Sequence, residues 1–332
     1  MLGGLWNELG KKLAERWLSL LVLPGALYLA VVVGSTALGH HHPFDVPRLI
    51  RWITVHAEHP SVGTVGGQAV LLAGVLVSAA AAGMAAQAAG SLVERLALAA
   101  DWESWPRPLR TIVAGRVGAR RARWVRAAHI YHRHRSTAAA ARAVGQREDP
   151  ALRRAAHRAM NRVSPELPAR PTWSGDRVNA VVVRLARDHH LDLVTVWPYL
   201  WLTLPDATRT ELGEARRALA RATVLTAWAI LYLPLAWWWW PAVLISGTLA
   251  LTGRARTRGG AATYALLLEA AARLYSGELA GHLGVAQAGP PPTVPEQYDP
   301  GGPLTAQTGE SLTHLLHSSV PPLPPEFTGQ GE

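Results

Sequence analysis

Residues 17–39 read WLSLLVLPGALYLAVVVGSTALG and contain no charged side chain. An apolar helix of about 20 residues crosses the roughly 30 Å of hydrocarbon in a bilayer. Pro24 and Gly25 fall inside this stretch, but neighbouring helices satisfy the freed backbone groups when the segment lies in a membrane bundle. A cleaved signal peptide is the alternative, although its apolar core is normally only about 7–15 residues long. The stretch therefore predicts a first transmembrane helix at 17–39.

A second uncharged stretch, at 65–90, is rich in alanine and glycine. Small residues recur in it at four-residue spacing, which lets helix backbones approach closely in a membrane. The alternative is that an alanine-rich segment matches such a pattern by chance. We predict a second transmembrane helix there that packs against another helix, or against a second copy of the chain in a homo-oligomer. The packing residues expected are Gly74, Ser78, Gly83 and Gly90.

Residues 219–252 predict a helical hairpin. Residues 219–237 are long enough for a third transmembrane helix, and four consecutive tryptophans, Trp237–Trp240, form the turn. Tryptophan is enriched at the interface between bilayer and water. Pro241 suits the first turn of the returning helix. The fourth apolar segment, 238–252, is short, and it either spans a thinned bilayer or re-enters it.

The flanks of these segments indicate the orientation. Arginine and lysine accumulate on the cytoplasmic side of membrane proteins. They precede the first and third segments and follow the second and fourth. We therefore expect a multi-pass protein of the cell membrane, with the N-terminus (1–16), a central domain (91–218) and a further helix (253–288) in the cytoplasm. The loop 40–64 is expected outside, although Arg48 and Arg51 lie in it.

The central domain carries much of the net charge of +10. A helix is predicted at Pro106–Val144, with arginines spaced so that they share one face, namely Arg116, Arg120, Arg123 and Arg126. A basic amphipathic helix beside a membrane binds the anionic inner leaflet. A solvated face and a nucleic-acid contact are the alternatives, the latter disfavoured because no nucleic-acid-binding fold is recognisable.

Further helices are predicted from Asp149-Pro150 to just before Ser164-Pro165 and from Ser174 to His190. The second of these has an apolar stripe that we expect to be buried, namely Val178, Val181, Val182 and Leu185. Asp149 as N-cap and Pro150 at the first helical position favour the start of the first of these helices. Trp197 and Trp201 lie four residues apart and share one side of a helical turn. We interpret their segment as an interfacial contact with the membrane surface, or otherwise as a buried strand or turn.

Residues 172–283 resemble a group of uncharacterised multi-pass membrane proteins from GC-rich, actinobacterial-type bacteria. The resemblance rests on Leu191-Asp192 followed by Trp197-Pro198-Tyr199-Leu200-Trp201, before a Trp-rich transmembrane hairpin. It implies a membrane-embedded helical fold and carries no activity.

Candidate chemistry is sparse. Five histidines in the loop 40–64 are weak candidates for a metal or for pH sensing, namely His40, His41, His42, His56 and His59. Three adjacent histidines cannot all face one ion unless a loop wraps it, so we predict no metal site. The chain has no cysteine, which excludes thiolate chemistry. No phosphate-binding loop or hydrolase motif occurs, and we expect no cofactor.

The tail at 289–332 is rich in proline and glycine, which predicts disorder. Its Leu323-Pro-Pro-Glu run offers a polyproline-type ligand for a protein partner. Together these patterns predict an all-α polytopic membrane protein with about four transmembrane helices in two pairs around a basic cytoplasmic domain. The expected function is that of a non-catalytic interaction or regulatory protein. An oligomeric pore or transport accessory, and a membrane enzyme acting on lipid or cell-wall precursors, are the alternatives.

Overall fold

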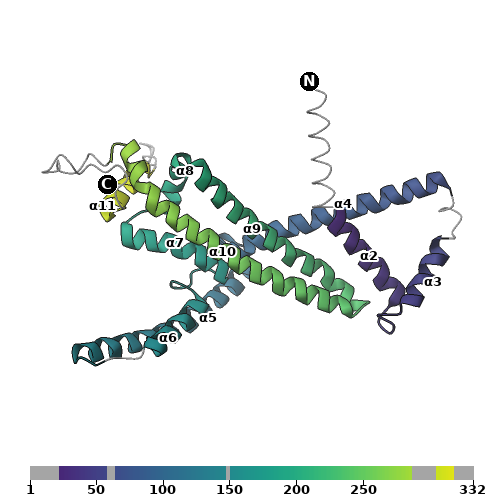
Figure 1. The fold of residues 1–332 in the computed structure, drawn as a ribbon, viewed down its shortest axis with the longest axis horizontal. Coiled ribbons are helices and arrows are strands. Elements are labelled where there is room, and N and C mark those ends of the chain that lie inside the picture. The colour runs from purple at the N-terminus through teal and green to yellow at the C-terminus, as the bar shows by residue number, and fades with distance from the viewer. Residues whose placement is uncertain (1–21, 58–63, 147–149, 286–303, 318–332) are drawn as a thin grey trace, which may run out of the picture. The chain divides into compact units, whose positions relative to one another are not determined.

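The computed structural model describes residues 22–57, 64–146, 150–285 and 304–317 (Figure 1). Every regular element among these residues is helical, so the predicted all-α class is confirmed. The chain divides into two compact units. Unit 1 comprises 1–97 and 217–260, and unit 2 comprises 98–216 and 261–332.

Unit 1 is built from α2 (Leu23–Leu38), α3 (Val46–Ala57), α4 (Val65–Leu98, as far as Ala97), the second half of α9 (Asp206–Tyr232), η3 (Leu233–Trp237) and the first half of α10 (Pro241–His282). Its core holds the rings of Tyr28, Trp228 and Tyr232. The Tyr28 centroid lies 5.8 Å from that of Trp228 and 5.2 Å from that of Tyr232. The Tyr28 hydroxyl also donates to the Leu231 carbonyl at 3.3 Å, which joins α2 to α9.

Two helices in the described part of the chain are long and apolar enough to cross a membrane. They are α4 and the continuous segment Asp206–Trp237. They coincide with the second and third predicted spans. The first predicted span is described only from residue 22 onward, and its helix α2 is 16 residues long. The fourth predicted span is not long and apolar enough to be counted with them, because its apolar part, 241–253, is followed by Arg254, Arg256 and Arg258 within the same helix.

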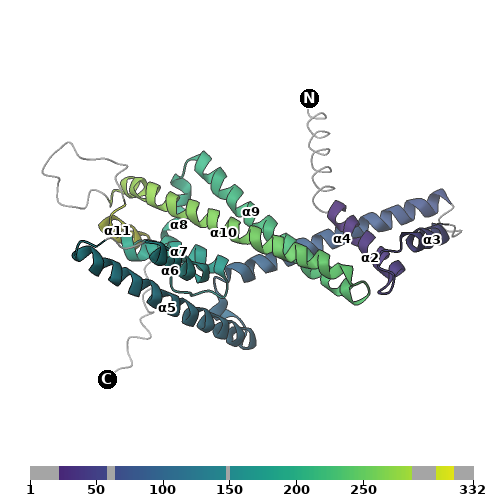
Figure 2. The ribbon, with the colours of Figure 1, turned by 60° about the horizontal axis from the view of Figure 1, so that its bottom comes forward.

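Unit 2 contains α5 (Arg107–Ala143), α6 (Pro150–Val163), α7 (Trp173–His189), α8 (Leu193–Thr203), α11 (Ala306–Leu316), η2 (Trp102–Ser104) and the remaining halves of α9 and α10. The predicted starts and ends of α5, α6 and α7 agree with these bounds to within about two residues. The expected apolar stripe of α7 is also confirmed, since Val181 and Leu185 are fully buried. Figure 2 shows α5 and α6 lying side by side.

Three features differ from the sequence-based expectations. The predicted fourth membrane segment and the cytoplasmic helix that follows it belong to one unbroken helix, α10, from Pro241 to His282. The loop 40–64 contains the helix α3. The prediction of disorder from 289 to 332 is wrong for residues 304–317, since α11 buries Leu304 and Leu312 in the core of unit 2. The rest of that tail lies outside the described residues.

Candidate functional site: a cationic helical arm

The helices α5 and α6 form what we call the cationic arm. Within Arg107–Ala143 and Pro150–Val163 the sequence has many arginines and no aspartate or glutamate. The two helices meet through small and apolar side chains, among them Ala128, Ala156 and Met160, which are buried. Alanine supplies high helix propensity while leaving the arginines on the outside. The arm therefore presents positive charge that no carboxylate on its own helices offsets.

A buried carboxylate fixes the base of the arm. Asp176, in the first turn of α7, is 2% exposed. Its Oδ1 accepts hydrogen bonds from the backbone N–H groups of Ala169 and Arg170, at 2.9 and 2.8 Å. Its Oδ2 accepts from Arg120 of α5 at 2.5 Å. One side chain thus ties α5, α7 and the loop 164–171 together.

Backbone carbonyls of the loop 164–171 take up further donors from α5. Arg116 donates to the Pro171 carbonyl at 3.1 Å, and Arg121 donates to the Pro168 carbonyl at 2.8 Å. Trp124 Nε1 donates to the Ser164 carbonyl at 3.0 Å. Buried carbonyls need such partners because an unpaired one is costly. The side chains at the base of α5 therefore act as a clamp on the loop.

Glycine is required where this loop meets α7. A Cβ on Gly175 would lie 2.5 Å from the Leu98 carbonyl oxygen. Nearby, the Arg170 guanidinium donates to the Ala99 carbonyl at 2.7 Å and to the Asn179 side chain at 3.2 Å. Burial lowers the pKa of Arg170, while the charges of Asp101, Asp176 and Glu103 oppose that shift. An arginine remains charged under these conditions, so both hydrogen bonds stay charge-assisted.

The predicted arginine stripe of α5 is split by this clamp. Arg116 donates to the Pro171 carbonyl of the loop 164–171 while the residue stays exposed, and Arg120 donates to the Val163 carbonyl at the end of α6. Arg120 is only 13% exposed as a side chain. Arg123 and Arg126, by contrast, are exposed and bond only to carbonyls one turn back on their own helix. Half of the predicted set is therefore structural, for a reason that spacing on one helix does not reveal.

A second row of arginines, absent from the sequence-based predictions, lies on α6. Arg154, Arg158 and Arg162 follow one another at four-residue spacing and are all exposed. At 1.5 Å of rise per residue, adjacent members are about 6 Å apart along the axis. The signal was present in the sequence ALRRAAHRAMNRV, where four-residue spacing can be read directly.

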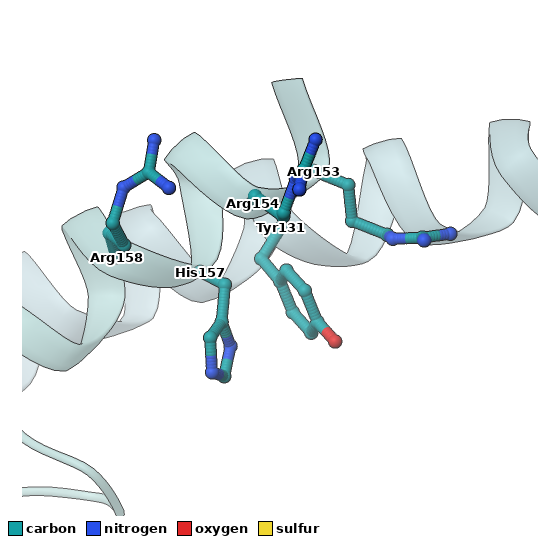
Figure 3. A pocket seen from close by; sticks show the side chains of 5 residues that line it. All are labelled: Tyr131, Arg153, Arg154, His157 and Arg158. Atoms are coloured by element: carbon teal, nitrogen blue, oxygen red, sulfur yellow. The ribbon is translucent and has the colours of Figure 1, made fainter. Parts of the chain in front are cut away.

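A shallow hollow of about 270 Å³ lies beside this stripe, lined by Tyr131, Arg153, Arg154, His157 and Arg158 (Figure 3). The rings of Tyr131 and His157 lie together, with centroids 5.2 Å apart. The guanidinium groups spread away from one another in Figure 3 and do not converge on one point. Dispersed charge of this kind suits a surface with many anionic groups better than a single enclosed ion.

Trp197 and Trp201 of α8 lie close together, with ring centroids 5.8 Å apart. Both are partly buried against the apolar core of unit 2. The exposed apolar side chains of α8 are instead Val194, Tyr199 and Leu202, at 72, 44 and 74%. The segment is a helix, so the alternative of a buried strand is excluded. If α8 meets a membrane surface, it does so through these three residues.

An ion pair joins α7 to α10 in unit 2. Arg184 donates to both carboxylate oxygens of Glu269, at 3.2 and 2.5 Å, and Arg273 donates to Oε1 at 2.9 Å. Burial raises the pKa of Glu269, but the hydrogen bond from Arg184 and the charges of Arg184, Arg273 and Arg177 together lower it below its ordinary value.

The small residues of α4 have two different surroundings. Gly83 and Gly90 are buried, and a Cβ on Gly90 would lie 2.6 Å from Val224 Cγ2 in α9. Gly25 of α2 packs directly on the Ala79 backbone. Gly74 and Ser78 are exposed, and nothing lies within 4 Å of a Cβ built on Gly74. Among the residues that the structure describes, packing thus uses only the C-terminal part of the predicted set of small residues.

The five candidate histidines are not brought together as far as they are described. The structure contains no group of three or more potential metal ligands among residues 22–57, 64–146, 150–285 and 304–317. His40, His41 and His42 are exposed, and His56 stacks on Trp52 with centroids 3.9 Å apart. His59 lies outside the described residues.

No protein-family model, curated protein or solved structure matches the chain.

Proposed function

We propose that this chain is a non-catalytic, membrane-anchored interaction protein that holds its cationic arm against the anionic inner leaflet. Unit 1 anchors it in the cell membrane through four spans in two pairs, and unit 2 lies in the cytoplasm with both termini. The observation that carries the proposal is the arm itself. Its helices have outward-facing arginines and no acidic residue, in a chain that also has two helices of membrane-spanning length.

Contacts within unit 1 support the proposed topology. Trp239 in the Trp-rich turn donates through Nε1 to the Pro43 carbonyl at 3.0 Å. The rings of Phe44 and Trp240 meet edge to face, with centroids 5.9 Å apart. Both connections join the loop after the first proposed span to the turn between the third and fourth. Two spans in each pair bring these segments to the same side of the membrane, as the contacts require.

The close packing of α9 and α10 supports a fourth span. The Ser246 hydroxyl donates to the Ala229 carbonyl at 2.7 Å, and Gly253 lies against Thr226. Small residues that let backbones approach are typical of membrane helix pairs. The apolar part of α10, 241–253, rises only about 20 Å. Its following arginines reach back to the headgroups, as long cationic side chains do at helix ends.

A lipid surface fits the arm better than nucleic acid does. Large aliphatic side chains are exposed between the arginines, with Ile112 at 70%, Ile130 at 44% and Leu152 at 61%. Such residues insert into the boundary between headgroups and acyl chains, while each nearby arginine adds on the order of 1 kcal/mol of attraction to an anionic leaflet. Phosphate contacts to nucleic acid use the arginines and leave the aliphatic groups in water.

The test uses the full chain in nanodiscs. A dye is placed on the arm through Ser136→Cys, since the natural chain has no cysteine, and energy transfer to a headgroup dye reports the distance of the arm from the lipid. We expect efficient transfer when phosphatidylglycerol is present, weak transfer in pure phosphatidylcholine, and a decrease with salt.

The matched variant is Arg154→Gln with Arg158→Gln and Arg162→Gln, which removes charge from exposed positions alone. We expect it to lose most of the dependence on phosphatidylglycerol. Equal transfer in neutral and anionic discs for the unmodified arm would contradict the proposal.

A further inference from the structure

The helix α3 has a defined start and two unlike faces. The Asp45 carboxylate accepts from the Arg48 backbone N–H at 3.0 Å, which is the geometry of an N-cap. Three aliphatic residues then recur at i, i+4 and i+7, namely Val46, Ile50 and Ile53. This spacing places them on one face of the helix. Arg48 and Arg51 project from the opposite face.

No residue that the structure describes covers the aliphatic face of α3. Val46 is 59% exposed, Ile50 57% and Ile53 52%. Three neighbouring aliphatic side chains on one helix face form a patch that water disfavours. Leu49, beside this face, and Trp52, closer to the arginine face, are half-buried, whereas the aliphatic face is open.

The start of α3 lies at the Trp-rich turn. Pro43 and Phe44, directly before the helix, contact Trp239 and Trp240 through the hydrogen bond and ring contact described above. Trp237 and Trp238 of the same turn are 84 and 56% exposed. Exposed tryptophans mark the level of the bilayer interface. The start of α3 thus lies beside residues that the proposed topology already places at that interface.

We infer that α3 lies along the outer leaflet of the bilayer, with Val46, Ile50 and Ile53 among the acyl chains. Arg48 and Arg51 then extend along the headgroups and bind lipid phosphates. This inference rests on the proposed function, because it takes the loop 40–64 to be outside. It also accounts for Arg48 and Arg51 on the outer side of the membrane, where arginine is normally sparse, because lipid phosphates bind both side chains there.

Two valines provide a matched test, because both are exposed and they differ in the face they occupy. Val46 lies on the aliphatic face, and Val55, which is 66% exposed, lies on the arginine face. Val46→Cys and Val55→Cys are made separately in the full chain, and intact cells are treated with a membrane-impermeant maleimide. Neither position is buried, so both variants fold.

We expect Val55→Cys to react readily and Val46→Cys to react at least about 10-fold more slowly, the factor to which burial of one valine side chain corresponds. Equal labelling of both positions in intact cells overturns the inference and leaves the outer location of the loop standing. Labelling of neither position until the cells are lysed would place the loop inside and contradict the proposed topology itself.

A spin label at Ile50→Cys in nanodiscs that hold one chain each separates lipid from protein as the covering partner. Lipid cover makes the label more accessible to oxygen than to a water-soluble nickel chelate. A label that is accessible to both in single-copy discs, and protected only when two copies share a disc, would assign this face to a second copy and overturn the inference.

Discussion

Replacing Asp176 with asparagine should strongly destabilise unit 2. The carboxylate is 1% exposed as a side chain and accepts three hydrogen bonds, one of them from the Arg120 guanidinium. An asparagine oxygen can still accept from the two backbone N–H groups, but its amide then faces the guanidinium donor to donor. Removing one partner of a buried ion pair typically costs about 3–5 kcal/mol, because the other charge is left uncompensated.

The assay is thermal unfolding of the detergent-solubilised full chain, followed by intrinsic tryptophan fluorescence. Trp102, Trp124 and Trp173 all donate to backbone carbonyls at the base of the arm, so the signal includes this region. At roughly 2–4 °C per kcal/mol for a unit of this size, the expected fall in Tm is about 6–20 °C.

Asp188→Asn is the matched control on the same helix. Asp188 pairs with Arg187 at the surface, where both side chains are well exposed, and such pairs contribute at most about 1 kcal/mol. A second control, Arg120→Gln combined with Asp176→Asn, should recover part of the loss, because it removes the stranded charge. If Asp176→Asn lowered Tm no more than Asp188→Asn, the buried aspartate would not be holding the arm.

Gly90→Val should lower the free energy of unfolding by about 1–3 kcal/mol, as overpacking typically does, because its Cβ would collide with Val224 of α9. Its Tm should therefore fall. Gly74→Val should leave Tm unchanged, since the space around Gly74 is open; similar effects of the two changes would refute the described packing of α4. The pKa of Glu269 is lowered in the folded chain, so its ion pair with Arg184 stabilises the protein fully above the unfolded pKa, about 4.3. This contribution is lost as the pH falls through the lower folded pKa. The Tm difference between the natural chain and Glu269→Gln should therefore be constant near neutral pH and shrink below about pH 4.5. A Tm difference that does not change with pH would contradict the reasoning.

Local signals in the sequence predicted the helices of unit 2 well. Proline at 150 and the Ser164-Pro165 pair bound α6, and the stripe of valines with Leu185 identified the buried face of α7. The uncharged stretch at 65–90 and the apolar stretch at 219–237 likewise correspond to the two helices of spanning length. These features depend on residues within one or two helical turns of each other, which is the range that pattern and propensity cover.

The division of the arginines on α5 could not be read in the same way. Arg116 and Arg120 have the same spacing as Arg123 and Arg126, but their partners lie 43–56 residues further along the chain. A single-helix pattern contains no information about a loop that folds back from that distance. The docking of α11 has the same origin, since Thr313 contacts the turn at His190 across 123 residues.

Other features left a signal that was not used. The four-residue spacing of Arg154, Arg158 and Arg162 and the aliphatic face of α3 are both legible in the sequence. Ser246, Gly253 and Gly260 recur at seven-residue spacing on α10, and each approaches α9 closely. This recurrence is the pattern of a tightly packed helix pair.

The most direct test of the account compares the accessibility of three single cysteines in intact cells: His41→Cys before α3, Trp238→Cys in the Trp-rich turn, and Ser136→Cys on the arm. All three positions are exposed in the structure. Four spans with the arm inside predict that a membrane-impermeant reagent labels 41 and 238 at once and labels 136 only after lysis. Labelling of 136 in intact cells, or opposite results for 41 and 238, would contradict the account.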